Sequence, residues 1–395
     1  TRAIDNLKKL KPSPLGMADD ATLIQAANYE QHMDLLGECD LVIEAIAERL
    51  DWKRDLQLDV SLIRKRENEH LLTCKGRGVG TVSFPELRKG KVGIFIATLL
   101  ARLMRQGMMP PLQRYESMPA SYAAGRGQLA YYEAMVEAGQ LRFIKNSKDL
   151  QNHIQQWREP VSETEPLGFI LSMEGADPVL HPSQVHHWFD LGLRIIGPAH
   201  YGVSPYAHGT STIGGFFPMG PDLLKEMQAC GMILDITHLS DQCFDEAMEL
   251  YGGPVLASHH NCRALVPDQR QLTDDQIKKL ISRKAVIGAA FDNWMLYPNW
   301  VRGKTTVKES GVTMNTVIDH IDRVCQLAGN SDHAALGTDL DGGFGTEQSP
   351  GDIDTIADLQ GFPALLKLRG YNDVDVAKIA HGNWIRFFTN AWDKK

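Results

Sequence analysis

The sequence predicts an α/β fold of the (β/α)8, TIM-type barrel class. Short runs of β-branched and apolar residues alternate with amphipathic stretches along most of the chain, a pattern typical of a parallel sheet with crossover helices. Eight such runs occur, and eight parallel strands close a barrel. The length of 395 residues and the mass of 44.0 kDa suit one large barrel with long loops.

The eight runs have the lengths expected of buried strands. They are Leu41–Ile46, Val92–Thr98, Gly168–Ser172, Leu193–Gly197, Met232–Thr237, Pro254–Ser258, Ala285–Ala290 and Ala334–Thr338. Helices are predicted between them where Gly, Pro, Asp or Ser stand in positions that helix caps prefer. Examples are Leu223–Ala229, Asp241–Leu250, Thr273–Ser282 and Thr313–Ala328. Three stretches are predicted to be irregular, and the first two are interpreted as rim or lid segments: Tyr201–Gly220, Asn293–Gly311 and Gln106–Gln128.

Polar side chains that bind metals or exchange protons follow most of these strands. In a barrel the loops at the C-terminal ends of the strands converge on one cup, so these positions are where chemistry is expected. The residues are Glu48, Glu174, His200, His238, His259 and Asp339. Six of the eight predicted strands therefore deliver such a side chain, which is far more than a random distribution would give.

The composition excludes several classes of protein. Lys and Arg number 41 against 49 Asp and Glu, and the formal net charge of −8 argues against nucleic acid as the main partner. The six cysteines form no C-x-x-C pair, so neither a redox motif nor a zinc ribbon is predicted.

No transmembrane segment is predicted, because the longest apolar run, Val92–Ala101, is well short of the roughly 20 residues that a membrane helix needs. The chain begins at Thr1 without a charged-then-apolar leader, and a leader could have been removed before this point. The compartment is left open, with a soluble, cytoplasmic protein as the preferred expectation.

Three of the strand-end residues suggest a metal site. Glu174, His238 and His259 supply the oxygen and nitrogen donors that zinc accepts, with room for water. A single histidine at a barrel mouth fits a structural hydrogen bond as well as a metal ligand. The combination of the three favours the ligand interpretation.

The segments around these residues read LSMEGAD, LDITHLS and VLASHHN, and GTDLDG (337–342) and GNW (382–384) follow further along. In this order they resemble the membrane (renal) dipeptidase family of zinc peptidases, over about residues 40–395. The resemblance implies a (β/α)8 barrel that cleaves dipeptides with two zinc ions. Bacterial members often accept a D-residue at the C-terminal position. Relatives are often dimers, which makes a homodimer possible although the sequence itself contains no interface signal, and the motifs favour a bacterial source.

By motif, Glu174 is similar to the family's glutamate that bridges the two zinc ions, and His238 and His259 to the histidines of the second zinc. The adjacent His260 is the less favoured ligand. The resemblance also implies that His200 polarises the scissile carbonyl of the substrate.

Two further roles follow from the same resemblance. Arg270 would hold the substrate carboxylate, since a guanidinium presents a planar fork to it, and Arg263 competes for this role. Asp339 would handle protons. The implied substrate-binding residues are thus Arg270 and His200, and the implied catalytic residues are Asp339 and His200.

One family motif is not in place. The family's first strand carries an H-x-D pair for the first zinc, whereas Ile46 and Glu48 occupy those positions here. Ile46 cannot bind zinc, but Glu48 could. The pair His32 and Asp34 lies earlier in the chain and is the other candidate. Either one or two zinc ions are therefore expected.

The N-terminal segment resembles a second family. Residues 1–55 are similar to part of the NAD-binding domain of 3-hydroxyacyl-CoA dehydrogenases, but the glycine-rich phosphate loop is absent, so NAD binding is not predicted. The expected organisation is an N-terminal appendage over residues 1–39 and a metallo-dipeptidase barrel over residues 40–395.

The leading hypothesis is zinc-dependent hydrolysis of dipeptides by attack of a metal-bound hydroxide. Two alternatives remain. One is a barrel that binds small carboxylates but has lost hydrolysis with the change at Ile46. The other is a one-metal amidohydrolase that acts on non-peptide amides or lactones.

Overall fold

The structure is a computed structural model, and it describes residues 79–103, 114–158 and 164–393. Contacts between residues divide the chain into two units, Thr1–Gln57 and Leu58–Lys395, and all described residues belong to the second. The first predicted strand, Leu41–Ile46, lies outside the described residues, as do His32, Asp34, Ile46 and Glu48.

Seven parallel strands of the described chain follow one another in the order expected of a barrel. In the main sheet, β1 (Ile94–Leu99) pairs with β5 (Leu167–Glu174), followed by β6 (Leu193–Gly197), β7 (Ile233–Asp235) and β8 (Val255–Leu256). A bridge between Ala257 and Ile287 continues the order to β9 (Ile287–Ala289), which pairs with β10 (Ala334–Leu336).

These seven strands confirm the seven predicted runs that fall within the described residues, and their ends differ from the prediction by three residues or fewer. Three short strands were missed: β4 (Leu141–Phe143), which pairs with the start of β5, and the separate pair of β2 (Arg102–Leu103) with β3 (Arg114–Tyr115). Two or three residues are too few to show the alternation of a strand.

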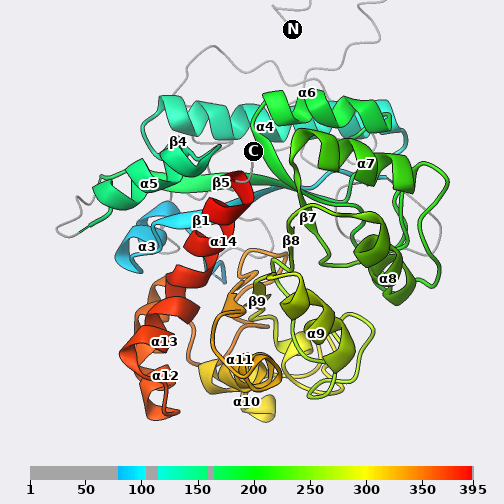
Figure 1. Cartoon of the computed structure of the whole chain (residues 1–395). Coiled ribbons are helices and arrows are strands. Elements are labelled where there is room, and N and C mark those ends of the chain that lie inside the picture. The colour runs from blue at the N-terminus through cyan, green and yellow to red at the C-terminus, as the bar shows by residue number, and fades with distance from the viewer. Residues whose placement is uncertain (1–78, 104–113, 159–163, 394–395) are drawn as a thin grey trace, which may run out of the picture. The chain divides into compact units, whose positions relative to one another are not determined.

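Helices surround the strands (Figure 1). Their bounds are α3 (Phe84–Lys89), α4 (Met118–Glu137), α5 (Ser147–Gln156), α6 (Val185–Asp190), α7 (Gly220–Cys230), α8 (Asp241–Leu250), α9 (Asp274–Ser282), α10 (Val307–Ser310), α11 (Met314–Ala328), α12 (Phe362–Leu368), α13 (Asp373–Ala377) and α14 (Asn383–Trp392). The four predicted helices correspond to α7, α8, α9 and α11. Their caps explain the agreement: Ser240 accepts a hydrogen bond from the backbone N–H of Cys243 at the start of α8, and Thr273 forms a capping box with Gln276 on α9.

The prediction of an irregular segment over Gln106–Gln128 was wrong for residues 118–128, which form the first half of α4. Ser117 caps this helix by accepting a hydrogen bond from Ala120 N–H, and Pro119 occupies its first turn, where no amide donor is required. Gly125 suggested a loop. A Cβ atom at Gly125 would lie 3.3 Å from Pro178, so this glycine serves close packing of the helix.

The helix α14 packs against the strands through one buried apolar cluster. Ile170, Ile195, Ile233 and Leu256 form this cluster with Phe387 and Phe388 of α14, which crosses in front of the strands in Figure 1. Trp384 Nε1 of the same helix donates to the carbonyl oxygen of Leu336.

Small residues bring the last strands together. Gly288 on β9 and Gly337 directly after β10 face each other, and a Cβ on either would lie about 2 Å from the carbonyl oxygen of Ser258, at 2.2 and 1.9 Å respectively. Only glycine fits at both positions. The two rim segments predicted at Tyr201–Gly220 and Asn293–Gly311 hold only isolated bridges, the 3-10 turn Asn293–Met295 and the single turn α10.

Candidate metal and catalytic site

The C-terminal strand ends deliver polar side chains at a regular offset. His200 follows the last residue of β6 by three positions, His238 follows β7 by three, and His259 follows β8 by three. Glu174 is the last residue of β5. The same offset of three places Arg102 after β1, Asp292 after β9 and Asp339 after β10.

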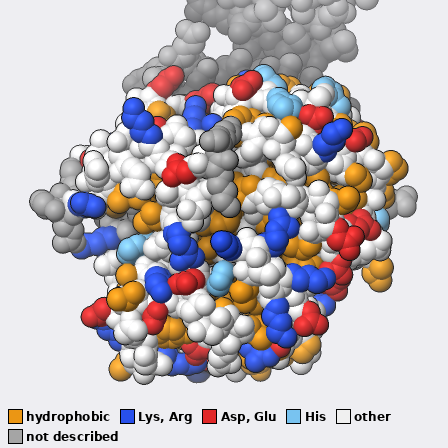
Figure 2. All heavy atoms as spheres, in the orientation of Figure 1, with side chains coloured by type: hydrophobic (Ala, Val, Ile, Leu, Met, Phe, Trp, Pro, Cys, Tyr) orange, Lys and Arg blue, Asp and Glu red, His pale blue; other side chains and the backbone are white. Residues whose placement is uncertain are grey.

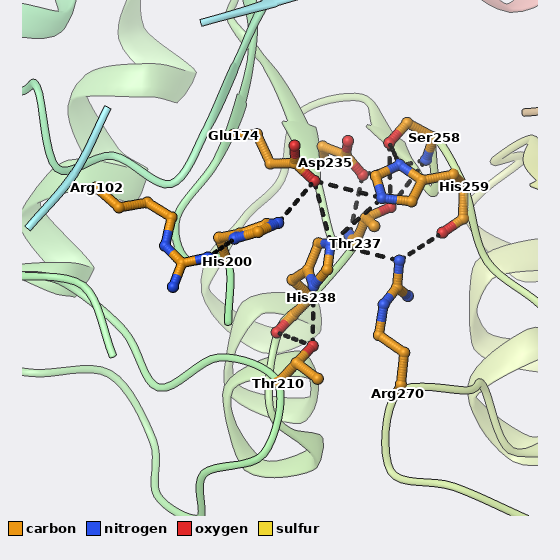
Figure 3. Close-up of polar contacts among 10 residues, drawn as sticks. All are labelled: Arg102, Glu174, His200, Thr210, Asp235, Thr237, His238, Ser258, His259 and Arg270. Carbon is orange, nitrogen blue, oxygen red and sulfur yellow. Dashed lines mark hydrogen bonds and ion pairs between the residues drawn. The ribbon is translucent and has the colours of Figure 1, made fainter. Parts of the chain in front are cut away.

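Glu174, His238 and His259 form the group that could hold a metal ion, with all candidate ligand atoms within 4.8 Å of one another. Glu174 Oε1 lies 3.1 Å from His238 Nε2 and 3.3 Å from His259 Nε2, and the two Nε2 atoms are 3.3 Å apart (Figure 3). Glu174 Oε1 is buried and accepts no hydrogen bond among the residues that the structure describes. A buried carboxylate oxygen facing two imidazole nitrogens fits the donor set of a divalent ion such as zinc.

The Nδ1 atoms of the two candidate ligands each meet a hydroxyl group. Thr210 Oγ1 lies 2.9 Å from His238 Nδ1 and 3.4 Å from the His238 carbonyl oxygen, and Ser258 Oγ lies 2.9 Å from His259 Nδ1 and 3.2 Å from Thr237 Oγ1. Each hydroxyl can donate to its oxygen partner and accept the Nδ1–H of the ring. The Nε2 lone pairs are then free to bind a metal ion.

The ends of β7 and β8 are fixed to each other by a buried network. Asp235 Oδ1 accepts from the N–H groups of Thr237 and Ser258 at 2.9 and 3.2 Å, and Thr237 Oγ1 accepts from Ser258 N–H at 3.0 Å. His238 has a φ of 70° and Asp339 a φ of 57°, the left-handed region that residues other than glycine seldom occupy. Such strain is typical of functional sites held in place by their surroundings.

The charges at the cluster are strongly coupled. Burial would raise the pKa of Glu174, but His200, His259 and Arg270 lower it to about 2, so the carboxylate is ionised. Burial, together with Arg270 and His259, lowers the pKa of His238 well below its usual value. Burial, with His238 nearby, does the same to His200. An ionised carboxylate beside neutral imidazoles is the state required for metal binding.

His259 is the exception among the three histidines. Burial lowers its pKa, but the nearby Asp339 and Glu174 outweigh burial and raise the pKa above its usual value. His260, next in the chain, is also buried, but it is not part of the metal-binding group found among the described residues, and its backbone N–H donates to the Gly288 carbonyl oxygen.

Arg270 brings a buried cation to the cluster, opposite Arg102 in Figure 3. Its side chain is only 2 % exposed, and its Nη2 atom donates to the His259 carbonyl oxygen at 3.0 Å and lies 3.4 Å from His238 Nε2. Its Nε and Nη1 atoms have no hydrogen-bond partner among the described residues. Buried donors of this kind are costly unless an acceptor completes them, so Arg270 fits an anionic ligand.

The competing residue Arg263 has other partners. Its Nη1 and Nη2 atoms donate to Asp241 Oδ2 and Oδ1 at 3.0 and 2.7 Å, and its Nε atom donates to the Gln271 carbonyl oxygen at 2.9 Å. This bidentate pair orients the loop that carries Arg270. Of the two arginines, Arg270 is therefore the one with donors left for a ligand.

Asp339 and Asp292 place two further carboxyls near the cup. Burial raises the pKa of Asp339 to about 7, with a contribution from Glu174. Burial raises the pKa of Asp292 to about 6 although Arg302 and Gln348 bind it, at 2.9 and 2.6 Å. Sequence reasoning missed Asp292 and Arg102. The sequence feature that could have identified them is their position three residues after a strand end, which both share with the three histidines.

Comparisons with known proteins show the family and the fold of this chain. The model of the membrane dipeptidase family, peptidase family M19, matches residues 46–394. A Klebsiella pneumoniae protein encoded in the pqqA 5′ region is 28% identical over 284 residues, which cover 68% of this chain and 96% of that protein. Dipeptidase tcpJ of Claviceps purpurea is 28% identical over 232 residues, which cover 57% of this chain and 51% of that protein.

Two solved structures share the fold. A metallopeptidase described as dipeptidase AC superposes with a TM-score of 0.68 at 22% identity, over 85% of this chain and 96% of its own. A Rhodobacter sphaeroides metallopeptidase, solved with a phosphinate mimic of the dipeptide L-Ala-D-Ala, gives a TM-score of 0.69 at 21% identity with the same coverage. These likenesses confirm the predicted fold class, and the first of the eight predicted strands lies outside the described residues. The family match covers most of the chain, and the protein therefore belongs to the membrane dipeptidase family, a family of metallo-dipeptidases.

Proposed function

We propose that the chain hydrolyses dipeptides at a zinc site formed by Glu174, His238 and His259. The observation that carries the proposal is the convergence of two imidazole Nε2 atoms on one buried carboxylate oxygen that accepts no hydrogen bond within the described part of the chain. A divalent ion bound there would polarise the scissile carbonyl and lower the pKa of a water molecule.

The cation of Arg270 is proposed to hold the substrate's C-terminal carboxylate. The two unpartnered donors of its buried side chain, Nε and Nη1, match the two oxygens of a carboxylate. This contact would fix the dipeptide in one direction relative to Glu174. It predicts a preference for short substrates, because the carboxylate must lie one residue from the scissile bond.

His200 and Asp339 are proposed to act on the scissile bond. His200 Nε2 lies 3.7 Å from Glu174 Oε1, so it faces the same space as the candidate ligands, and as an N–H donor it would stabilise the developing negative charge on the carbonyl oxygen. Asp339, with a pKa of about 7, can take up and release a proton near neutral pH.

A D-residue at the C-terminal position of the substrate is part of the proposal. The similar Rhodobacter sphaeroides protein was solved with a mimic of L-Ala-D-Ala. A panel that pairs each L,L dipeptide with its L,D isomer tests this point directly. Equal turnover of both isomers would contradict a stereochemical preference.

The proposal allows either one or two zinc ions per chain. Glu48, or His32 with Asp34, would have to supply the first site, whereas the second site needs only Glu174, His238 and His259. Elemental analysis of the purified protein distinguishes the cases. One equivalent that is lost in a His238→Ala/His259→Ala double variant indicates a one-ion enzyme, and two equivalents indicate a replacement ligand.

The deciding experiment is an assay of the zinc-loaded chain against L,L and L,D dipeptides, with the His238→Ala/His259→Ala double variant as the control. Turnover that depends on both histidines supports the proposal. Thermal stabilisation by dipeptides without formation of product would favour the barrel that only binds its ligand. Ile46, which stands in place of the family's histidine, is the feature of the sequence that supports this alternative. No turnover and no stabilisation by any dipeptide would refute the proposal.

A further inference from the structure

Three histidines face Glu174, yet their second ring nitrogens have different partners. The Nε2 atoms of His238, His259 and His200 lie 3.1, 3.3 and 3.7 Å from Glu174 Oε1. By distance alone, His200 could be a third nitrogen ligand. The partner of each Nδ1 atom decides otherwise.

His238 and His259 have partners that can accept a proton. Thr210 and Ser258 are hydroxyl groups, which accept and donate hydrogen bonds, and each also has an oxygen to which it can donate. Both rings can therefore carry the proton on Nδ1 and keep a lone pair on Nε2. This is the tautomer of a histidine that binds a metal through Nε2.

His200 has a partner that can only donate. Arg102 Nη1 lies 2.7 Å from His200 Nδ1, and a guanidinium has no acceptor. Nδ1 must then supply the lone pair, and in the neutral ring the proton sits on Nε2, the atom that faces Glu174. Figure 3 shows Arg102 reaching His200 from the side away from His259.

We propose that Arg102 is a positioning residue that keeps His200 in the Nε2–H tautomer, so that His200 donates a hydrogen bond to the substrate carbonyl and does not become a third histidine ligand. This inference rests on the function proposed above and specifies which of the three histidines are ligands and which is the donor.

The fold holds Arg102 firmly enough for this task. It follows β1 by three residues, is only 5 % exposed, and begins β2, whose next residue Leu103 donates its N–H to Asp177 Oδ1 at 3.0 Å. Asp177 itself follows β5 by three positions. Two neighbouring strand ends thus fix the direction of the guanidinium.

The chain contains the same pairing away from the site. Arg142 Nη1 lies 2.9 Å from His153 Nδ1, and His153 Nε2 lies 2.8 Å from the Gly93 carbonyl oxygen, which can only accept. There too the arginine and the carbonyl together require the proton on Nε2. Arg142 therefore provides a matched control for Arg102.

The first test reads the tautomer directly. The measurement is a set of ¹⁵N NMR spectra of the chain, with and without added zinc. A protonated ring nitrogen and a lone-pair nitrogen have distinct chemical shifts. The variant His200→Gln identifies the signals of His200 among those of the 14 histidines. We expect Nε2–H in the wild type and in Arg142→Met, and a shift toward Nδ1–H in Arg102→Met. A wild-type ring with the proton on Nδ1 would overturn the proposal without any variant at Arg102.

The second test separates kcat from KM. We expect Arg102→Met to lower kcat by about 10- to 100-fold with little change in KM. Arg102→Lys should recover part of this loss, because lysine keeps a hydrogen-bond donor. The control variant Arg142→Met should retain activity. In a His200→Gln background, Arg102→Met should cause no further loss. Equal losses in both backgrounds would refute the role. If no dipeptide were hydrolysed at all, the proposed function would fail, while the tautomer measurement would still decide this inference.

Discussion

The Nη2 atom of Arg270 lies 3.0 Å from the carbonyl oxygen of His259, so the cation proposed to bind substrate is anchored to the strand end that carries a candidate metal ligand. In the proposed function, the substrate carboxylate and the ion would therefore be held by one rigid unit.

Replacing Arg270 by Met should raise KM for dipeptides by about 100-fold, because a buried charge-assisted pair with the substrate carboxylate is lost. Kinetics with C-terminally amidated dipeptides provide the control. The wild type should lose affinity for the amide, whereas Arg270→Met should treat acid and amide alike. A variant that still prefers the acid would place the carboxylate elsewhere.

Removing His238 or His259 should abolish binding of zinc at this site. Chelation should lower the melting temperature of the wild type, because an ion that binds only the folded chain stabilises the fold. At an ion concentration of 100 times the dissociation constant, the free energy of unfolding rises by about 2.7 kcal/mol. The adjacent His260→Ala is the control, since His260 lies outside the metal-binding group. Isothermal titration with zinc measures the difference. Equal loss in His260→Ala would contradict the ligand assignment.

Thr210→Val should weaken zinc binding by about 10- to 100-fold, because the hydroxyl that orients His238 through Nδ1 is removed without a change in shape. Thr212→Val is a matched control in the same loop, since its hydroxyl donates to the Gly209 carbonyl oxygen. Competition with a chromogenic chelator gives both affinities. Similar values for the two variants would mean that the Thr210 contact does not orient a ligand.

The raised pKa of Asp292 predicts that the free energy of unfolding falls as pH rises. Its folded pKa of about 6 exceeds the usual 3.8, so the folded chain binds the proton more tightly than the unfolded chain does. As pH rises from about 4 to about 6, ionisation costs the wild type stability, by roughly 3 kcal/mol from the two-unit difference. Asp292→Asn lacks this dependence.

Urea unfolding of the wild type and Asp292→Asn at pH 4 and pH 7 measures this effect. The difference in unfolding free energy should move in favour of the variant at the higher pH. The ion pair with Arg302 forms only when Asp292 is ionised, and its effect is already contained in the folded pKa of about 6. A pH-independent difference would show that Asp292 titrates normally.

Gly342→Ala should reduce kcat while the fold is retained. A Cβ at this position would lie 2.2 Å from Asp339 Oδ1, and the carboxylate is the part that can move away. Gly127→Ala on α4, where the added methyl meets no atom within 4 Å, is the control. In an Asp339→Asn background Gly342→Ala should have no further effect on kcat. An additive loss there would mean that Gly342 acts through another group.

Charged side chains of both signs are interspersed over the face shown in Figure 2, in keeping with the modest net charge in the sequence. Among the described residues, no helix is both long and apolar enough to cross a membrane.

The sequence by itself determined the order of the strands and the side chains at their ends. Strands such as β6 and helices such as α8 matched their predicted ranges because apolar runs and caps are local signals. Glu174, His238 and His259 were identified for the same reason, since each directly follows an apolar run. The helix α4 was missed in part because Gly125 serves packing against Pro178, which is distant in sequence.

Only the tertiary structure decided how these side chains pair. Arg102 and His200 are 98 residues apart, and Arg270 and His238 are 32 apart, so no local pattern indicates that they meet. Which arginine has free donors and which histidine nitrogen keeps its lone pair depend on hydrogen bonds between different strand ends. Those bonds exist only after the parallel strands bring their C-terminal ends to one place.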